Sequence, residues 1–440
     1  FDSFVLNFYT SSAELYHIRS MMKIGMIGLG KLGMPVALGM NMKGHDVMGY
    51  DLNPNCCQTQ TFPHREMGPN QETSIEPLLQ KSSIKFGSLE EVVDHAEIIF
   101  IAVQTPHDPE YEGITRIPKS RKNFDYTWLV SALEELSRAV EKKGEDRVII
   151  VISTVLPGTI RKHVLPKLGS HIKLCYNPFF IAMGTTIRDF YNPEFILFGV
   201  HDSESAKKAE TFYKTITDAP FYLTTIENAE MIKVSYNTYI GMKIVFGNTL
   251  MEICHKLPHC DVDIVTNALS LGGRRLMSGA YLRGGMGDGG GCHPRDNIAL
   301  SWLAGELKLK HDFYSDIMQA REDQTEWLAD LIVEYNGDKI ILGKSFKPET
   351  NLTVGSPSLL LRSLLEERNV KVLMWDPHVD GMQIPEFAKL KAVYFIGTQH
   401  TYFQSFPFAA GSVVLDPFRY IPDQIDVRII QIGSAKTGKF

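Results

Sequence analysis

The chain has 440 residues, the length of about three average domains. Hydrophobic residues make up 44% of it, charged residues 22% and aromatic residues 10%, which is typical of a globular protein with real cores. A net charge of −6 without a run of Lys or Arg argues against a nucleic-acid partner. The lack of any apolar stretch of about 18 residues argues against a membrane span.

The cysteines and the N-terminal residues bear on the cellular compartment. Six cysteines form no CxxC pair, so we expect free thiols in a reducing cytoplasm. Residues 1–21 do not resemble a secretory signal, because Asp2, Glu14 and His17 interrupt any apolar core. We expect an N-terminal extension or a vector-derived remnant there, with an extra ordered element as the alternative.

Short apolar strands alternate with helices from Lys23 onward. The strands are expected at 23–28, 45–51, 97–103, 147–153, 173–176 and 195–200, and helices at 31–43 and 125–143. From about Glu227 the pattern changes to long helices, through 256 and then at 261–270 and 296–336, with a glycine-rich interruption. Such a helical block between two α/β parts favours a dimer core.

The alternation restarts at Asp338. Strands are expected at 339–343, 370–376, 392–397, 412–416 and 427–433, and a helix at 356–368. The sequence therefore predicts an α/β protein with two Rossmann-like, doubly wound parallel-sheet domains joined by a long-helix region. The expected domains are a nucleotide-binding domain at 22–224, a central helical region at 225–330 and a second α/β domain at 331–440.

The strongest motif is a glycine-rich turn between the first strand and the first helix. Its residues are Gly28, Leu29, Gly30, Lys31, Leu32 and Gly33. Gly28 permits the tight turn, Gly30 lets a pyrophosphate approach the backbone, and Gly33 allows the helix to pack closely on the strand. Asp51 ends the next strand, and its carboxylate can accept both ribose hydroxyls and repel a 2′-phosphate. The motif predicts bound NAD rather than NADP, and a glycine-rich turn without a ligand is the alternative.

Two polar motifs follow later strands. Val103-Gln104-Thr105-Pro106 lies after the strand at 97–103, and residues 153–159 lie after the strand at 147–153. Ligands bind beyond the carboxyl ends of parallel strands, so we expect Val103, Thr105, Pro106 and Thr154 near the cofactor. Turn and helix-cap chemistry explains the Thr and Pro residues equally well.

The helix that starts near Glu227 carries Lys233 and Asn237, which are four residues apart and share one face. An ammonium and an amide together can stabilise a developing oxyanion. A solvated helix face is the alternative interpretation.

A glycine-rich segment at 284–296 has six glycines in its first eight positions and then Cys292. A core does not need so many glycines, which instead let the backbone approach a ligand closely. Cys292 precedes a helix, where the dipole and nearby cations favour a thiolate, and an inert buried thiol is the alternative. We expect no metal site, because neighbours such as Cys292 and His293 rarely both reach one ion.

Six motifs in this order resemble the UDP-glucose/GDP-mannose dehydrogenase family. They are GLGKLG with Asp51, VQTP, STVLPGT, ENAEMIKVSYNTY, GGMGDGGGCHPRD and SFKPETNLTVGSPS. The resemblance runs from about Lys23 to the C-terminal end. It implies a homodimer in which each chain has an NAD domain, a central helical dimerisation region and a nucleotide-sugar domain.

The resemblance also implies an activity, the NAD-dependent oxidation of the C6 alcohol of a nucleotide sugar, UDP-glucose or a related UDP-sugar first, to the uronate. By similarity, Cys292 would form a thiohemiacetal that is oxidised to a thioester and hydrolysed. Lys233 and Asn237 would stabilise the C6 oxyanion, and Thr154 and Asp296 would organise water and protons. The implied substrate contacts are Lys233, Asn237, Arg275 (which could come from the other subunit), Gly287, Gly289, Gly290 and Lys347.

The chain departs from the family pattern after Asn177-Pro178. The family has Glu at the two places held here by Phe179 and Met183, and the first Glu is its expected base for hydrolysis. Phe179 cannot accept a proton, so His293 or Asp288 is a candidate substitute. The downstream Glu194 falls at another family position and is interpreted as structural.

Further departures from the family pattern fall at positions expected to contact the nucleotide of the sugar substrate or of the cofactor. Leu352 and Val354 stand where the family has Asp and Arg, and Cys56 replaces a basic residue often found after the ribose Asp. Two alternatives to the uronate-forming enzyme therefore remain open. One is two-electron oxidation only, giving an aldehyde or acting on a small hydroxy acid. The other is a non-catalytic module that binds NAD or a nucleotide sugar.

Overall fold

The structure is a computed structural model. It describes residues 21–60, 62–64, 66–71, 73–106, 123–201, 203–278, 284–287, 301 and 303–434. The chain forms two compact units, the first ending at Gly241 and the second starting at Met242, so that the boundary falls inside helix α7 (Ile226–Lys256). The division into three domains stays a prediction, and the expected N-terminal extension lies outside the described residues apart from Met21.

The first unit is built on an eight-stranded sheet with the strand order β3-β2-β1-β4-β5-β6-β7-β8. The strands are β1 (Lys23–Ile27), β2 (Asp46–Tyr50), β3 (Lys85–Phe86), β4 (Ile98–Ile101), β5 (Arg147–Val151), β6 (Ile172–Tyr176), β7 (Ile196–Val200) and β8 (Phe221–Thr224). All neighbours pair in parallel except β6 and β7. The predicted mainly parallel sheet is confirmed.

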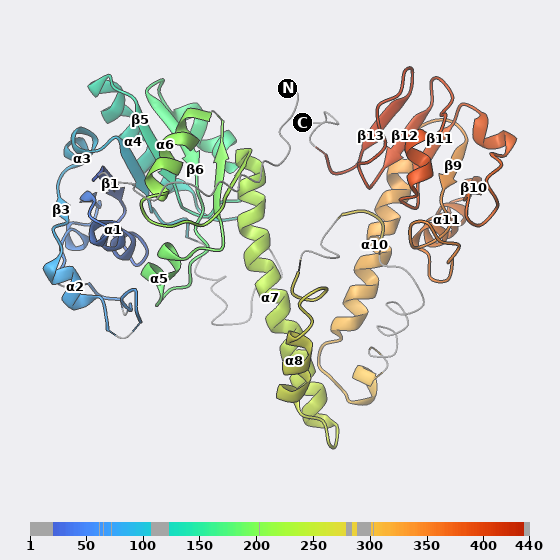
Figure 1. Cartoon of the computed structure of the whole chain (residues 1–440), viewed down its shortest axis with the longest axis horizontal. Helices are drawn as coiled ribbons and strands as arrows, with labels where there is room; N and C mark the ends of the chain where they lie inside the picture. The colour runs from blue at the N-terminus through green and yellow to red at the C-terminus, as the bar shows by residue number, and fades with distance from the viewer. Residues whose placement is uncertain are drawn as a thin grey trace, which may run out of the picture. The chain divides into compact units, whose positions relative to one another are not determined.

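Helices cover both faces of this sheet (Figure 1). They are α1 (Gly33–Met42), α2 (Glu76–Lys81), α3 (Leu89–His95), α4 (Thr127–Lys143), α5 (Thr186–Tyr191) and α6 (Ser203–Tyr213), followed by α7. The side chains of β4 alternate between the faces: Ile98 and Phe100 pack with α1, α5 and α6, whereas Ile99 and Ile101 pack with α3, α4 and the start of α7. Burial on both faces explains why the central strands are continuous apolar runs.

The second unit has a five-stranded parallel sheet in the order β10-β9-β11-β12-β13. Its strands are β9 (Lys339–Leu342), β10 (Val372–Trp375), β11 (Val393–Ile396), β12 (Val413–Asp416) and β13 (Arg428–Gln431), and its helices are α8 (Val262–Ser270), α10 (Phe313–Val333) and α11 (Pro357–Glu367). Helices α10 and α11 cover one face, and an aromatic cluster that includes Trp375 and Phe403 covers the other. The predicted α/β class with two Rossmann-like sheets is thus confirmed.

The helical region expected at 296–336 is interrupted. Residues 303–306 are helical, but the chain leaves the helix by Lys308, whose φ is +53°. The side chain of Asp312 then accepts a hydrogen bond from the backbone N–H of Ser315 and starts α10. The apolar period continues across this break, so periodicity alone did not reveal it.

No helix among the described residues is both long and apolar enough to cross a membrane.

Candidate active site

The turn after β1 has the backbone that the glycine motif requires. Gly28 has φ +89°, and a Cβ there would lie 2.7 Å from the carbonyl oxygen of Ala102. A Cβ on Gly33 would lie 1.8 Å from the carbonyl oxygen of Gly28, so only glycine lets α1 pack this closely. Above Gly30 there is open space, which leaves room for a ligand against the backbone.

The start of α1 and the end of β2 face this turn. No side chain caps α1, and its first turn carries no acidic residue, so its positive end can attract an anion. The carboxylate of Asp51 accepts hydrogen bonds from the backbone N–H groups of Leu29 at 2.7 Å and Asn53 at 2.8 Å. One lone pair on each oxygen remains for a ribose hydroxyl.

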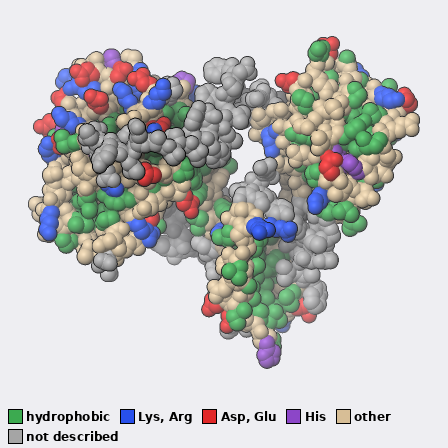
Figure 2. All heavy atoms as spheres, in the orientation of Figure 1, with side chains coloured by type: hydrophobic (Ala, Val, Ile, Leu, Met, Phe, Trp, Pro, Cys, Tyr) green, Lys and Arg blue, Asp and Glu red, His purple; other side chains and the backbone are tan. Residues whose placement is uncertain are grey.

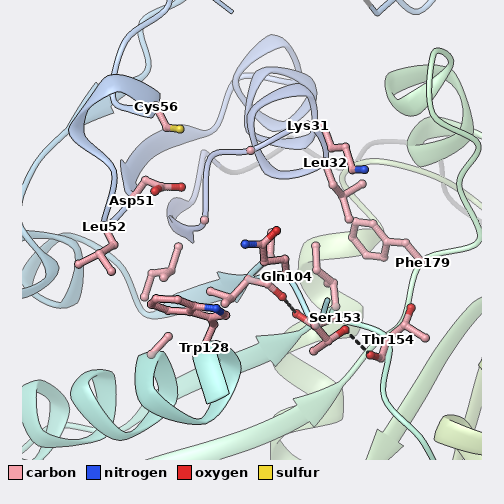
Figure 3. A pocket seen from close by; sticks show the side chains of 18 of the residues that line it. Lys31, Leu32, Asp51, Leu52, Cys56, Gln104, Trp128, Ser153, Thr154 and Phe179 are labelled. Atoms are coloured by element: carbon pink, nitrogen blue, oxygen red, sulfur yellow. Dashed lines mark hydrogen bonds between the residues drawn. The ribbon is translucent and has the colours of Figure 1, made fainter. Parts of the chain in front are cut away.

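A cavity of about 810 Å³ opens beside the turn and lies wholly in the first unit (Figure 3). From the expected cofactor set it is lined by Gly28, Gly30, Lys31, Leu32, Asp51, Val103, Thr105 and Thr154. Leu29 and Gly33 are buried behind the lining, and Pro106 lies just outside it. At the far end the cavity reaches Lys233 and Asn237 on α7. One cavity therefore joins the predicted cofactor turn to the predicted oxyanion pair.

Lys233 is a buried ammonium with few polar partners. Its side chain is 7% exposed, its Nζ lies 3.4 Å from Oδ1 of Asn237, and the same Nζ lies 5.1 Å from the centre of the Phe180 ring. Burial lowers the pKa of Lys233 to about 8. The contact between Lys233 and Asn237 agrees with the shared helix face that their spacing predicted.

The loop that carries Thr154 is fixed at both ends. The hydroxyl of Ser153 donates to the carbonyl of Val103 at 2.5 Å, and that of Thr105 donates to the carbonyl of Thr154 at 2.7 Å. Further along, the carboxylate of Glu230 accepts hydrogen bonds from backbone N–H groups of the same loop. These contacts hold the loop against both β4 and α7.

The wall beside Lys233 is apolar at the two positions where the resemblance implies carboxylates. Phe179, Ile181 and Met183 all line the cavity, and the Phe179 ring packs 5.8 Å from that of Phe190. This wall offers no proton acceptor at either replaced position.

A smaller cavity of about 320 Å³ also has Lys233 and Asn237 in its wall. It contains Glu194, which is exposed and lies 3.5 Å from the hydroxyl of Tyr236, and Asp189, which accepts hydrogen bonds from the N–H of Ala182 and the hydroxyl of Thr185. Glu194 therefore lines the same cavity as Lys233, and the structural role expected for it stays a prediction.

The remaining expected residues are not brought together with Lys233 by the described structure. Arg275 is exposed after α8, Gly287 lies beside the side chain of Arg321, and Lys347 is exposed after β9, all in the second unit. Cys292, Asp296, Gly289 and Gly290, together with the substitute bases Asp288 and His293, lie outside the described residues.

In the second unit, Glu349, His378 and His400 bring potential metal ligands within 4.8 Å of one another. The two nitrogens of His400 are already used: Nδ1 accepts the N–H of Glu349 at 2.9 Å, and Nε2 lies 3.1 Å from Oδ2 of Asp376. A metal would have to displace these bonds, so this arrangement suits a hydrogen-bond network better than a cation.

Sequence reasoning missed the residues at the Asp51 end of the cavity. Trp128 and Leu52 are 50% and 70% exposed although both are large and apolar, and both line the cavity (Figure 3). Trp is rare in the chain, with four residues, and the place of Trp128 at the start of α4 was the available signal. An exposed aromatic ring in the same cavity as the carboxylate expected to hold a ribose suits a planar base.

Family models match most of the chain. The NAD-binding domain of the UDP-glucose/GDP-mannose dehydrogenase family matches residues 22–217, and the central domain of that family matches residues 227–322. The structure is similar to that of a GDP-mannose dehydrogenase from Pseudomonas aeruginosa, with a TM-score of 0.81, 24% identity and coverage of 93% of this chain and 99% of that chain.

Curated relatives carry two substrate names. A GDP-mannose 6-dehydrogenase from Pseudomonas aeruginosa is 28% identical, with coverage of 82% of this chain and 83% of the relative. A UDP-glucose 6-dehydrogenase from Bacillus subtilis is 27% identical, with coverage of 81% and 80%. The motifs, the fold and these matches agree, and the cofactor is NAD. The chain belongs to the UDP-glucose/GDP-mannose dehydrogenase family of NAD-dependent nucleotide-sugar dehydrogenases.

Proposed function

We propose that the chain oxidises the C6 alcohol of a nucleotide sugar to the uronate, with UDP-glucose or a related UDP-sugar as the first candidate. The observation that carries the proposal is the single cavity that joins the Gly28 turn and Asp51 to Lys233 and Asn237. GDP-mannose is the direct competitor, because relatives of nearly equal identity carry each name.

The residues of the first unit would divide the work between cofactor and substrate. Asp51 would hold the adenosine ribose, and the amides at the start of α1 would hold the pyrophosphate. When bound, NAD accepts the two electrons and the hydrogen that leave C6. Lys233 and Asn237 would stabilise the oxygen of C6 as its negative charge grows, because both side chains reach the cavity and lie within 3.4 Å of each other. Thr154, which lines the same cavity, would orient water.

The residues outside the first unit complete the proposal. Cys292 would attack the C6 aldehyde, and Asp296 would assist proton transfer. Arg275, Gly287, Gly289, Gly290 and Lys347 would bind the sugar nucleotide. In this proposal the central helical region forms the dimer contact and the C-terminal domain binds the nucleotide sugar. The cysteine usage, without a CxxC pair, favours a reducing cytoplasm.

A second candidate is oxidation by two electrons only, with an aldehyde as the product. The apolar wall of Phe179, Ile181 and Met183 favours it, since no side chain there can activate water. The number of NADH molecules formed per sugar separates the two candidates.

We also propose a homodimer formed through the central helices. Large apolar side chains are exposed on α7 and α8, and Figure 2 shows hydrophobic side chains gathered on this part of the surface. In the second unit they include Met242, Phe246, Met251, Ile264 and Leu269. Exposed apolar side chains that gather on one face suit contact with a second copy. Light scattering of the purified chain would give twice the chain mass, and the mass of a single chain would contradict the dimer.

The test of the activity is a panel of UDP-glucose, UDP-N-acetyl sugars and GDP-mannose with NAD, followed by NADH absorbance. NADH formation with one sugar supports the proposal. Binding of NAD and sugar without NADH formation would instead indicate a non-catalytic binding protein.

A further inference from the structure

Glu230 is a fully buried carboxylate between two parts of the cavity wall. It lies on α7, three residues before Lys233, and its side chain has no exposed surface. Its Oε2 accepts the backbone N–H of Gly158 at 2.6 Å, and its Oε1 accepts that of Ile160 at 2.8 Å. Both oxygens are thus bound where the Thr154 loop runs into a short π-helical turn (Ile160–Val164), about seventy positions away in the sequence.

The loop held by Glu230 is the one that carries Thr154. Gly158 sits at φ +86°, a conformation that favours glycine, and its N–H is one of the two that Glu230 accepts. The apolar side chains of Val155 and Ile160 pack in the same cluster as Ala229 of α7. Hydrophobic packing keeps the loop near the helix, and the two hydrogen bonds determine its register.

The buried charge is costly unless these hydrogen bonds are made. Burial raises the pKa of Glu230, while the N–H donors of Ile160 and Gly158 act in the opposite direction. The carboxylate makes two charge-assisted hydrogen bonds here, and such bonds are stronger than hydrogen bonds between neutral groups. Two hydrogen bonds to one carboxylate fix both the distance and the orientation between α7 and the segment at Gly158 and Ile160.

We propose that Glu230 is a positioning residue that fixes the Thr154 loop relative to Lys233, and so sets the geometry of the reacting end of the cavity. This inference rests on the proposed function for its catalytic effect, but the positioning itself can be measured without turnover. A displacement of about 1 Å at a reacting centre can cost about a hundredfold in rate.

The test compares Glu230→Gln with two matched variants. Gln keeps one oxygen but turns an NH₂ group toward one of the two N–H donors, so one hydrogen bond is lost. Glu227→Gln removes a neighbouring carboxylate of α7 that pairs with Arg161 at the surface of the same loop. Asp416→Asn removes a second buried clamp, which binds the N–H groups of Tyr420 and Ile421 in the second unit.

The first readout is the labelling of Lys233 by an amine-reactive ester, measured by peptide mass spectrometry against the exposed Lys142. In Glu230→Gln the loosened loop should raise the relative labelling of Lys233 about fivefold or more, and neither control should do so. The second readout is kinetic: kcat should fall about tenfold or more while KM for NAD changes less than about threefold, because the Asp51 end is untouched.

Unchanged labelling and unchanged kcat in Glu230→Gln would overturn the proposal. An equal loss in Asp416→Asn would also overturn it, because that result would indicate a general cost of losing a buried clamp. If Glu230→Gln does not fold, Glu230→Asp keeps the charge but cannot reach both N–H groups, and should give an intermediate effect on both readouts. If the wild-type chain forms no NADH with any sugar, the proposed function fails, while the labelling experiment still decides the role of Glu230.

Discussion

Asp51 and Asp376 hold equivalent places in the two sheets, but only Asp51 faces a cavity. Gly28 after β1 and Gly343 after β9 both have positive φ and donate their N–H to the last residue of the neighbouring strand. The next N–H, from Leu29 or Lys344, goes to the carboxylate of Asp51 or Asp376 at 2.7 Å in each case. The second unit thus repeats the glycine turn and the carboxylate contact of the first.

The two carboxylates differ in what else surrounds them. Asp376 has no exposed surface. Burial alone would raise the pKa of Asp376, but hydrogen bonds from His400 and from the backbone N–H groups of Lys344, Ser345 and His378 bring it well below its usual range. The ring of His400, which is also fully buried, lies against the carboxylate that a ribose would need. The repeated turn in the second unit is therefore closed to a dinucleotide bound as in the first.

The contrast between Asp51, which faces a cavity, and Asp376, which is buried, predicts different outcomes when each is replaced by Ala. Asp51→Ala should raise KM for NAD by about ten- to a hundredfold, because a charge-assisted contact is worth about 1.5–3 kcal/mol. Its Tm should fall less than that of Asp376→Ala, because Asp51 lines the cavity, where water can replace the lost carboxylate. It should also improve the use of NADP relative to NAD. Asp376→Ala should instead lower Tm by about 5 °C or more, because buried N–H groups lose their acceptor. Thermal melts and initial rates check both, and equal effects on KM would contradict the contrast.

Trp128 should contribute to cofactor binding although it lies outside the glycine motif. Its exposed ring lines the cavity near Asp51 and Leu52, and stacking of a base on an aromatic ring is worth about 1–3 kcal/mol. Trp128→Ala should weaken NAD binding by about tenfold, and Trp128→Phe should restore most of it. Calorimetric titration with NAD measures this, and an unchanged Kd in Trp128→Ala would remove the ring from the site.

The pH dependence should report Lys233. Its pKa is lowered to about 8 by burial, so the ammonium that stabilises an oxyanion is present below pH 8 and lost above it. We expect kcat to fall as pH rises through 8. Lys233→Arg keeps the charge at all accessible pH values and should lose this fall, at a lower kcat. A rise of kcat through pH 8 that disappears in Lys233→Arg would instead indicate that the neutral amine acts as a base.

Because the apolar wall of Phe179, Ile181 and Met183 offers no base, hydrolysis of the acyl intermediate is the step whose rate a substitution there should change most. Cys292→Ala should abolish the second oxidation, because without the sulfur no thioester can form. Phe179→Glu should speed uronate release where hydrolysis limits the rate, and Phe179→Gln, which has a similar size but no basic oxygen, should not. Mass spectrometry of intact protein would detect an acyl group retained on the wild-type chain. Equal rates for the Glu and Gln variants would exclude a missing base at this position.

The sequence predicted the parts of this account that depend on local patterns. The alternating apolar runs located nearly all strands of both sheets, and the spacing from Gly28 to Asp51 predicted the cofactor and its turn. The four-residue spacing of Lys233 and Asn237 predicted their contact because helix geometry alone sets it.

Features that depend on tertiary packing were not predicted. Glu230 and Glu66 look like ordinary surface carboxylates in the sequence. The fold shows that both are buried and that both accept hydrogen bonds from backbone N–H groups far along the chain. The structural role assigned to Glu194 from its place before β7 stays a prediction, and its place in the wall of a cavity beside Lys233 depends on how β7 and α7 lie together. The break before α10 depends on Lys308 and Asp312, which do not alter the apolar period.

The central claim is that the cavity of Lys233 and Asn237 carries a nucleotide sugar through both oxidations. The most direct measurement is the ratio of NADH formed to sugar consumed, with the product mass determined in the same samples. The account predicts two NADH per sugar and a uronate. One NADH per sugar with an aldehyde product would contradict the four-electron reaction, and no NADH with any nucleotide sugar in the panel would contradict the proposed activity itself.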